Sequence, residues 1–122
     1  MRMNRKKFEK VVEEALDELP EEIAEALSNV YVVVEDWPSR EALESTGLRD
    51  RYELLALYEG VPLTDRGTSY AALPDRITIF QGPIESISRT DPELLGQIKK
   101  AVVHEIAHHF GIDDDRIHEL GY

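Results

Sequence analysis

Cysteine is absent from the sequence, so no disulfide bond can hold the fold together. That absence fits a reducing compartment, and we expect the protein to be cytoplasmic. Long hydrophobic runs are also missing, because no apolar stretch approaches the roughly 18 residues that a transmembrane helix requires. The basic start of the chain is followed by an acidic, amphipathic stretch, whereas a signal peptide would continue with an apolar core. We therefore expect a globular protein without a membrane span or a secretion signal.

Positive charge is scarce. The sequence has 14 Lys and Arg residues against 25 Asp and Glu residues, which gives a net charge of −11 at pH 7. A strongly acidic chain repels the phosphates of nucleic acids and anionic bilayers, so we expect neither as a partner. The 122 residues are enough for one hydrophobic core and too few for two, which predicts a single domain over 1–122. A monomer is the simplest state compatible with this size.

The strongest chemical signal is the pentapeptide His104-Glu105-Ile106-Ala107-His108, which lies near the C-terminus within a predicted helix. Residues four apart lie on nearly the same face of a helix, so His104 and His108 project together and can share one metal ion. Glu105 is rotated from that face by roughly 100° and can reach a water molecule beside the metal. Two imidazoles and a carboxylate at this spacing match two ligands and the general base of a zinc hydrolase.

A helix rich in His and Glu could also be an ordinary solvated surface, but three features argue against this interpretation. Val102, Val103 and Phe110 give the helix a wide apolar side, so we expect the two histidines to be partly buried. Buried imidazoles without partners are costly. Gly111 predicts the end of the helix and a reversal of the chain, and an acidic cluster follows at once. These features favour a metal site.

A catalytic zinc ion takes three protein ligands and leaves one position for water, so a third ligand is needed. Only 14 residues follow His108, and we expect the ligand among them because Gly111 lets the chain fold back. The candidates are Asp113, Asp114, Asp115, His118 and Glu119. Asp114, three residues after the glycine, has the best spacing, and His118 is the second choice because imidazole is a good zinc ligand. Asp113 is better placed as the N-cap of a last helix over 114–120.

The longer pattern His104-Glu105-x-x-His108-x-x-Gly111-x-x-Asp114 resembles the extended zincin signature of metzincin-like peptidases. The chain as a whole is similar to the small bacterial minimal zincins, a family of zincin-like metallopeptidases, in segments 57–63, 108–114 and 119–122. The resemblance implies Asp114 as the third ligand, an active-site helix packed on a small twisted sheet, and a peptide or protein substrate. One departure is that methionine occurs only at positions 1 and 3, so no methionine turn can lie beneath the metal.

Hydrophobic periodicity predicts the other elements. Helices are expected over 4–19, 21–28 and 40–44, with a short helix or turn over 84–88. The long helix is expected to have Asp91 as its N-cap and Pro92 as its first residue. Strands are expected over 30–35, 53–59 and 75–81, although the pattern of 53–59 also fits a helix. Residues 61–75 contain Pro and Gly and are expected to form one long loop.

These elements predict an α+β fold, in which a small mixed sheet of about three strands packs on two N-terminal helices and the metal-binding helix. In the plan of the family that the chain resembles, a peptide pairs with an edge strand, for which we take 77–81. His109 is expected on the surface or supporting a ligand. Tyr70 and Tyr122 are candidate hydroxyl donors to a reaction intermediate, with packing as the simpler interpretation. Trp37 is interpreted as a packing residue.

Two functions fit the sequence. The first is a zinc-dependent peptidase, in which Zn²⁺ held by His104, His108 and Asp114 activates water and Glu105 is the general base. The second is a zinc-binding or peptide-binding module without turnover, which the lack of a second domain to close a cleft supports. Glu105 favours the peptidase, because a purely structural zinc site does not need a general base. A closed site with both Asp114 and His118 as ligands would favour the module.

Overall fold

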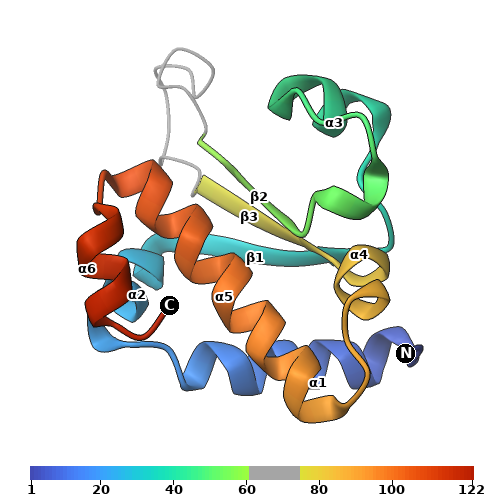
Figure 1. Ribbon diagram of the computed structural model, residues 1–122, viewed down its shortest axis with the longest axis horizontal. Helices are drawn as coiled ribbons and strands as arrows, with labels where there is room; N and C mark the ends of the chain where they lie inside the picture. The colour runs from blue at the N-terminus through green and yellow to red at the C-terminus, as the bar shows by residue number, and fades with distance from the viewer. Residues whose placement is uncertain (61–74) are drawn as a thin grey trace, which may run out of the picture.

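The computed structural model describes residues 1–60 and 75–122, in which helices pack around a three-stranded mixed sheet (Figure 1). The α-helices are α1 Arg5–Asp17, α2 Glu21–Ala26, α3 Arg40–Thr46, α4 Gln81–Ser86, α5 Asp91–Phe110 and α6 Asp114–Glu119. Two short 3₁₀ helices are η1 Leu27–Asn29 and η2 Arg51–Glu53. This is the α+β arrangement that the sequence predicts. The predicted loop over 61–75 lies outside the described residues, except for Asp75.

The sheet has the order β1-β3-β2, with β1 Val30–Glu35, β2 Ala56–Glu59 and β3 Asp75–Phe80. Strand β3 is parallel to β1 and antiparallel to β2. The prediction that 77–81 is an edge strand is therefore wrong, because β3 is the central strand and Gln81 already begins α4. The burial of Ile77, Thr78, Ile79 and Phe80 agrees with a position between two neighbours. Strands β1 and β2 form the two edges of the described sheet.

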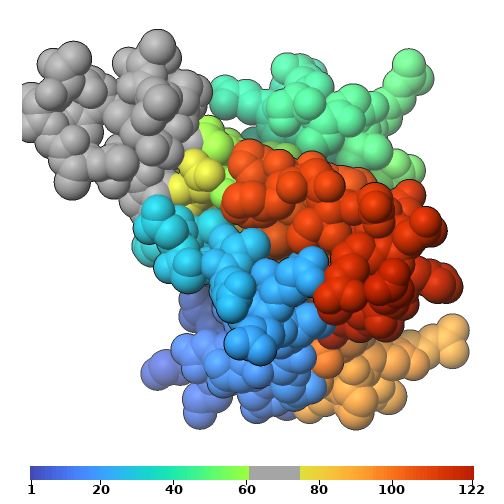
Figure 2. Space-filling view, turned by 90° about the vertical axis from the view of Figure 1, so that its left-hand side faces the viewer, coloured from blue at the N-terminus to red at the C-terminus, as the bar shows by residue number. Residues whose placement is uncertain are grey.

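Helix α5 runs across the molecule from α1 to β2 and contacts both (Figure 1). Its apolar side belongs to a core that also contains β3 and the N-terminal helices; the buried members on α5 are Leu94, Ile98, Val102, Val103, Ile106 and Ala107. Figure 2 shows the C-terminal segment, in red, packed directly against the N-terminal segment, in blue. The core therefore fixes how α5 is rotated, and with it the direction of the side chains on its other face.

The ends of α5 are set by local hydrogen bonds. The N-cap is Thr90, whose side chain accepts from the amide of Glu93, so the prediction of Asp91 as the cap is off by one residue. The C-cap is Gly111, with φ of 71°, a conformation that residues with a Cβ adopt at a cost. The chain then turns into α6, whose N-cap is Asp113 as predicted. In the described parts of the chain, no helix is both long and apolar enough to cross a membrane.

Candidate metal centre

His104 and His108 lie four residues apart on the continuous helix α5, as the sequence predicts. His104 is half-buried, and its Nε2 atom is buried without a hydrogen-bond partner in the described part of the chain. A buried polar atom in this state is costly unless a ligand satisfies it. An imidazole nitrogen is a good zinc ligand, so this orphaned atom fits a metal ion.

The charge state of His104 also suits a metal ligand. Burial lowers the pKa of His104, and the charges of Lys100 and His108 lower it further, whereas Asp114 and Glu105 oppose the shift. A lowered pKa keeps the imidazole neutral near pH 7, which is the form that donates its nitrogen lone pair.

His108 differs from the expectation for the histidine pair. The sequence predicts that both imidazoles are partly buried, but the structure leaves His108 exposed. The reason is its place in the last turn of α5, where His108, His109 and Phe110 are all exposed although Ile106 and Ala107 remain buried. The pair therefore has one half-buried imidazole and one that solvent reaches freely.

Glu105 lies at the outer edge of β2, where its Oε2 accepts a hydrogen bond of 3.0 Å from the backbone N–H of Tyr58. The amide of Phe80 donates to the carbonyl of Leu55, and bonded pairs alternate along an antiparallel ladder. Ala56 and Tyr58 consequently direct their backbone groups away from β3 and toward the free edge. The carboxylate of Glu105 and the free edge of the sheet are thus adjacent.

Asp114 is the first residue of α6 and is exposed. Its charge is among those that act on His104. Within residues 1–60 and 75–122, however, no group of three or more His, Cys, Asp or Glu side chains is close enough to share a metal ion. The charge of Asp114 thus reaches His104, but the described residues do not close a three-ligand site. His118 is exposed on the same helix.

Tyr58 is the centre of a cluster that the sequence does not predict. Its hydroxyl donates to Asp75 Oδ2 at 2.7 Å, and its ring stacks on that of His109 with centroids 3.9 Å apart. Burial, followed by the hydrogen bond to Asp75, raises the pKa of Tyr58 well above 10, so the hydroxyl stays protonated. Phe110 packs edge-on against both rings. Only the presence of 57–63 in the family resemblance hinted that this segment reaches the site.

The other aromatic candidates lie elsewhere. Tyr122 packs against the core and near Lys99, which supports the packing interpretation. Trp37 lies so close to Gly82 that any side chain there would overlap its ring, and Tyr52 packs against it edge-on. Tyr70 lies outside the described residues.

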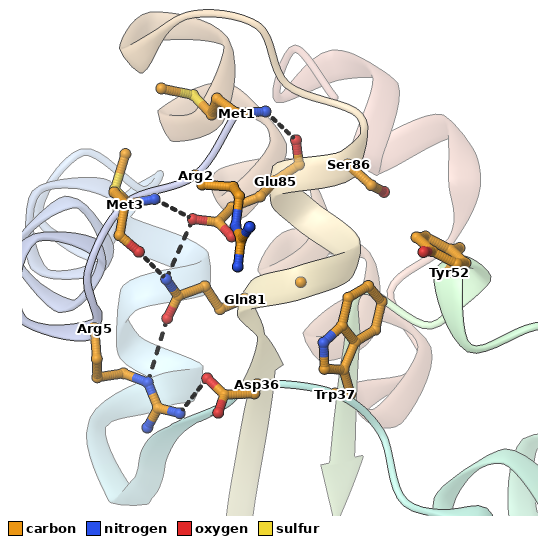
Figure 3. Close-up of a pocket in the computed structure, with 11 residues that line it drawn as sticks. Met1, Arg2, Met3, Arg5, Asp36, Trp37, Tyr52, Gln81, Glu85 and Ser86 are labelled. Carbon is orange, nitrogen blue, oxygen red and sulfur yellow. Dashed lines mark hydrogen bonds and ion pairs between the residues drawn. The ribbon is translucent and has the colours of Figure 1, made fainter.

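A cavity of about 580 Å³ lies beside the N-terminal segment, and neither His104 nor His108 lines it (Figure 3). Four of its polar side chains are bonded to one another: Arg5 donates to Gln81 and Asp36, and Gln81 donates to Glu85. Glu85 also accepts from the amide of Met3. Because these groups are mutually satisfied, we interpret the network as one that holds the N-terminal segment to α4.

A helix that carries two histidines and a glutamate beside the free edge of a mixed sheet is the arrangement of a zincin. The family profile of zincin-like metallopeptidases matches residues 27–122, and the chain belongs to this family. The match begins after α2 and so leaves α1 outside it. Among curated proteins, none matches the chain.

Proposed function

We propose that the protein is a zinc-dependent peptidase, with His104, His108 and Asp114 as the metal ligands and Glu105 as the general base. The single observation that carries the proposal is the buried, unpartnered Nε2 of His104, one turn from His108 on a helix whose glutamate faces a free strand edge. When bound, zinc supplies a Lewis acid that makes water acidic near neutral pH and polarises a carbonyl.

Glu105 accepts the proton of the attacking water and returns it to the leaving amine. Its hydrogen bond from Tyr58 supports this role, because it orients the carboxylate while lone pairs remain available for a proton. Tyr58 is in turn held by Asp75 and stacked on His109, so the backbone that orients the base is itself anchored.

An extended peptide is the substrate that this site can hold. The outward backbone groups of Ala56 and the carbonyl of Tyr58 on β2 can pair with a peptide strand, which would then pass directly beside Glu105, to which the Tyr58 N–H already donates. The edge is β2, in place of the strand 77–81 that the sequence suggested. The lack of cysteine supports a cytoplasmic place of action.

The test compares wild type with Glu105→Gln, both loaded with zinc and assayed on a broad peptide library. The substitution keeps the size of the side chain and its ability to accept from Tyr58, but it removes the base. We expect the variant to fold, to retain zinc, and to lose peptide hydrolysis by about 10²–10⁴-fold. Equal rates for the two proteins would refute the mechanism. A zinc-loaded wild type that cleaves no peptide would support the alternative of a non-catalytic binding module.

A further inference from the structure

A groove of about 380 Å³ lies between α1 and β1, at the edge of the sheet opposite to β2. Residues 31–34 of β1 line one side of this β1 groove. The other side is one stripe of α1, because Glu9, Val12, Glu13 and Leu16 follow each other at helical spacing. None of the proposed zinc ligands lines the groove, so it is separate from the candidate metal centre.

The strand pairing shows which backbone groups of β1 point into the open edge. The amide of Phe80 donates toward β2, so the alternate residues Ile77 and Ile79 of β3 direct their backbone groups toward β1. In a parallel pair these groups bond the residues on either side of the Cα partner, so β1 is held through its residues 31, 33 and 35. The residues at 30, 32 and 34 consequently direct their N–H and C=O groups outward.

Some of these outward groups already have partners at the ends of the strand. The N–H of Val30 donates to the carbonyl of Leu27, and the carbonyl of Val34 accepts from Arg5 Nη1 at 2.9 Å. Within the described part of the chain, this leaves the carbonyl of Val30, both groups of Val32 and the N–H of Val34. These groups are the ones that an extended segment uses when it adds a strand to a sheet edge.

The side chains of the β1 groove favour a basic partner. Glu9 and Glu13 are exposed, and neither has a hydrogen bond or an ion pair with another described residue. Between them the stripe is apolar, with Val12 only 4% exposed and Leu16 half-buried. A Lys or Arg side chain matches both parts, because its aliphatic stem covers apolar surface while its charged end reaches a carboxylate.

A second copy of the chain fits this edge poorly. Two β1 strands paired about a two-fold axis would place both α1 helices on the same face of the joint sheet, with Glu9 and Glu13 of each copy close together. Each chain also has a net charge of −11, so the copies repel each other. The same charges attract a cationic segment, and they disfavour an acidic one.

We propose that the β1 groove is a docking site for an extended, basic segment of another protein, which adds a fourth strand to the sheet. Every second side chain of an added strand lies on the α1 side, so the recognised segment carries Lys or Arg at alternate positions. This interaction surface goes beyond the proposed peptidase activity and does not depend on it.

Binding is measured on the full-length protein with Glu105→Gln, so that the proposed activity cannot consume the probe. The probe is a blocked heptapeptide in which threonine and lysine alternate, with three lysines. One control peptide has glutamate in place of lysine, and another has the same composition with the three lysines consecutive. The alternating lysine peptide should bind most tightly and the glutamate peptide least. Equal or tighter binding of the consecutive peptide would overturn the proposal, because it would show unspecific attraction.

Amide hydrogen exchange, followed by NMR, locates the added strand. At a peptide concentration of about ten times Kd, exchange at Val32 and Val34 should slow by roughly tenfold. The amide of Val33 points toward β3 and is the internal reference, since it should be protected with and without peptide. Slow exchange of Val32 and Val34 in the protein alone would show an edge that is already covered, and would overturn the proposal. Protection at Ala56 without protection at Val32 would also overturn it.

Two double variants test the charges. Glu9→Gln with Glu13→Gln should weaken binding of the alternating lysine peptide by roughly 2- to 30-fold, as expected for two exposed ion pairs. Glu14→Gln with Glu25→Gln is the matched control, because it removes the same charge from exposed positions outside the groove and should retain the affinity. Equal losses in both variants would reduce the effect to long-range attraction and overturn the docking site.

Sedimentation of the protein without peptide tests the second copy as the occupant. We expect a monomer, in which the amides of Val32 and Val34 exchange rapidly. A dimer in which these two amides are protected would assign the β1 edge to a second copy and overturn the proposal. Each of these measurements is independent of peptide hydrolysis, so failure of the proposed peptidase leaves their interpretation unchanged.

Discussion

The carboxylate of Glu105 and the backbone amide of Tyr58 are joined by a hydrogen bond of 3.0 Å, although 47 residues separate them in the chain. This contact connects the histidine-bearing helix to β2, one of the two edge strands of the described sheet. A charge-assisted bond from a backbone donor is stronger and more directional than a bond between neutral side chains. The proposed base is therefore oriented by the same strand that would align the proposed peptide substrate.

The first prediction concerns metal binding. Protein supplied with zinc and then freed of excess should retain about one equivalent, because two imidazoles on one face supply a ready pair of ligands. Elemental analysis measures this stoichiometry. The double variant His104→Ala, His108→Ala should retain none, whereas His109→Ala should retain zinc, since that ring stacks on Tyr58. Full zinc binding by the double variant would contradict the assignment.

The second prediction uses the pKa of His104, which burial lowers from 6.5. As pH falls below 6.5, the unfolded chain takes up a proton at this residue before the folded chain does, so the free energy of unfolding decreases. Denaturant titrations of metal-free protein between pH 7.5 and 5 measure this slope. His104→Asn removes the titrating group and should flatten the slope in this window. An unchanged slope would show that His104 titrates alike in both states.

The third prediction concerns the third ligand. Asp114→Ala should weaken zinc binding much more than Asp115→Ala, because the charge of Asp114 acts on His104. Asp113→Ala should mainly lower stability, by about 1 kcal/mol, since its side chain caps α6. Competition with a chelator of known affinity gives the zinc affinities. A larger effect of His118→Ala than of Asp114→Ala would transfer the role to His118.

The fourth prediction tests the turn that places Asp114. Gly111 has φ of 71°, and the space around its Cα is open, so a side chain there meets no clash. Gly111→Ala should therefore lower the free energy of unfolding by about 1–2 kcal/mol, because alanine is strained in the left-handed backbone conformation. It should also weaken zinc binding by displacing Asp114. Gly111→Asn should recover most of both losses, because Asn tolerates this conformation. Identical behaviour of the two variants would exclude the backbone explanation.

The sequence predicted well those features that depend on neighbours along the chain. The positions of most helices, the cap at Asp113, and the shared face of His104 and His108 all follow from local periodicity and local hydrogen bonds. The cap of α5 was misplaced by one residue because Thr90 and Asp91 are both good caps. Such signals are short-range, so a single sequence contains them.

Features that depend on distant segments were not predictable in the same way. The side-chain pattern of 75–81 indicates burial but does not say which strands lie beside it, so the sequence alone does not identify the central strand. The contacts of Tyr58 with Glu105 and Asp75 likewise depend on how β2 meets α5. The proposed role of Asp114 rests on the family spacing and on its charge near His104.

The first helix, α1, is needed to shield the apolar side of α5 from water. It lies outside the residues that define the family, yet it covers the apolar side of α5 with Phe8, Val11, Val12 and Ala15. A fragment trimmed to the family boundary would leave that side of α5 open to water, and an exposed apolar surface of this kind promotes aggregation. The family segment that contains the two-histidine helix α5 is thus not self-sufficient, and the isolated family region would expose part of its apolar core.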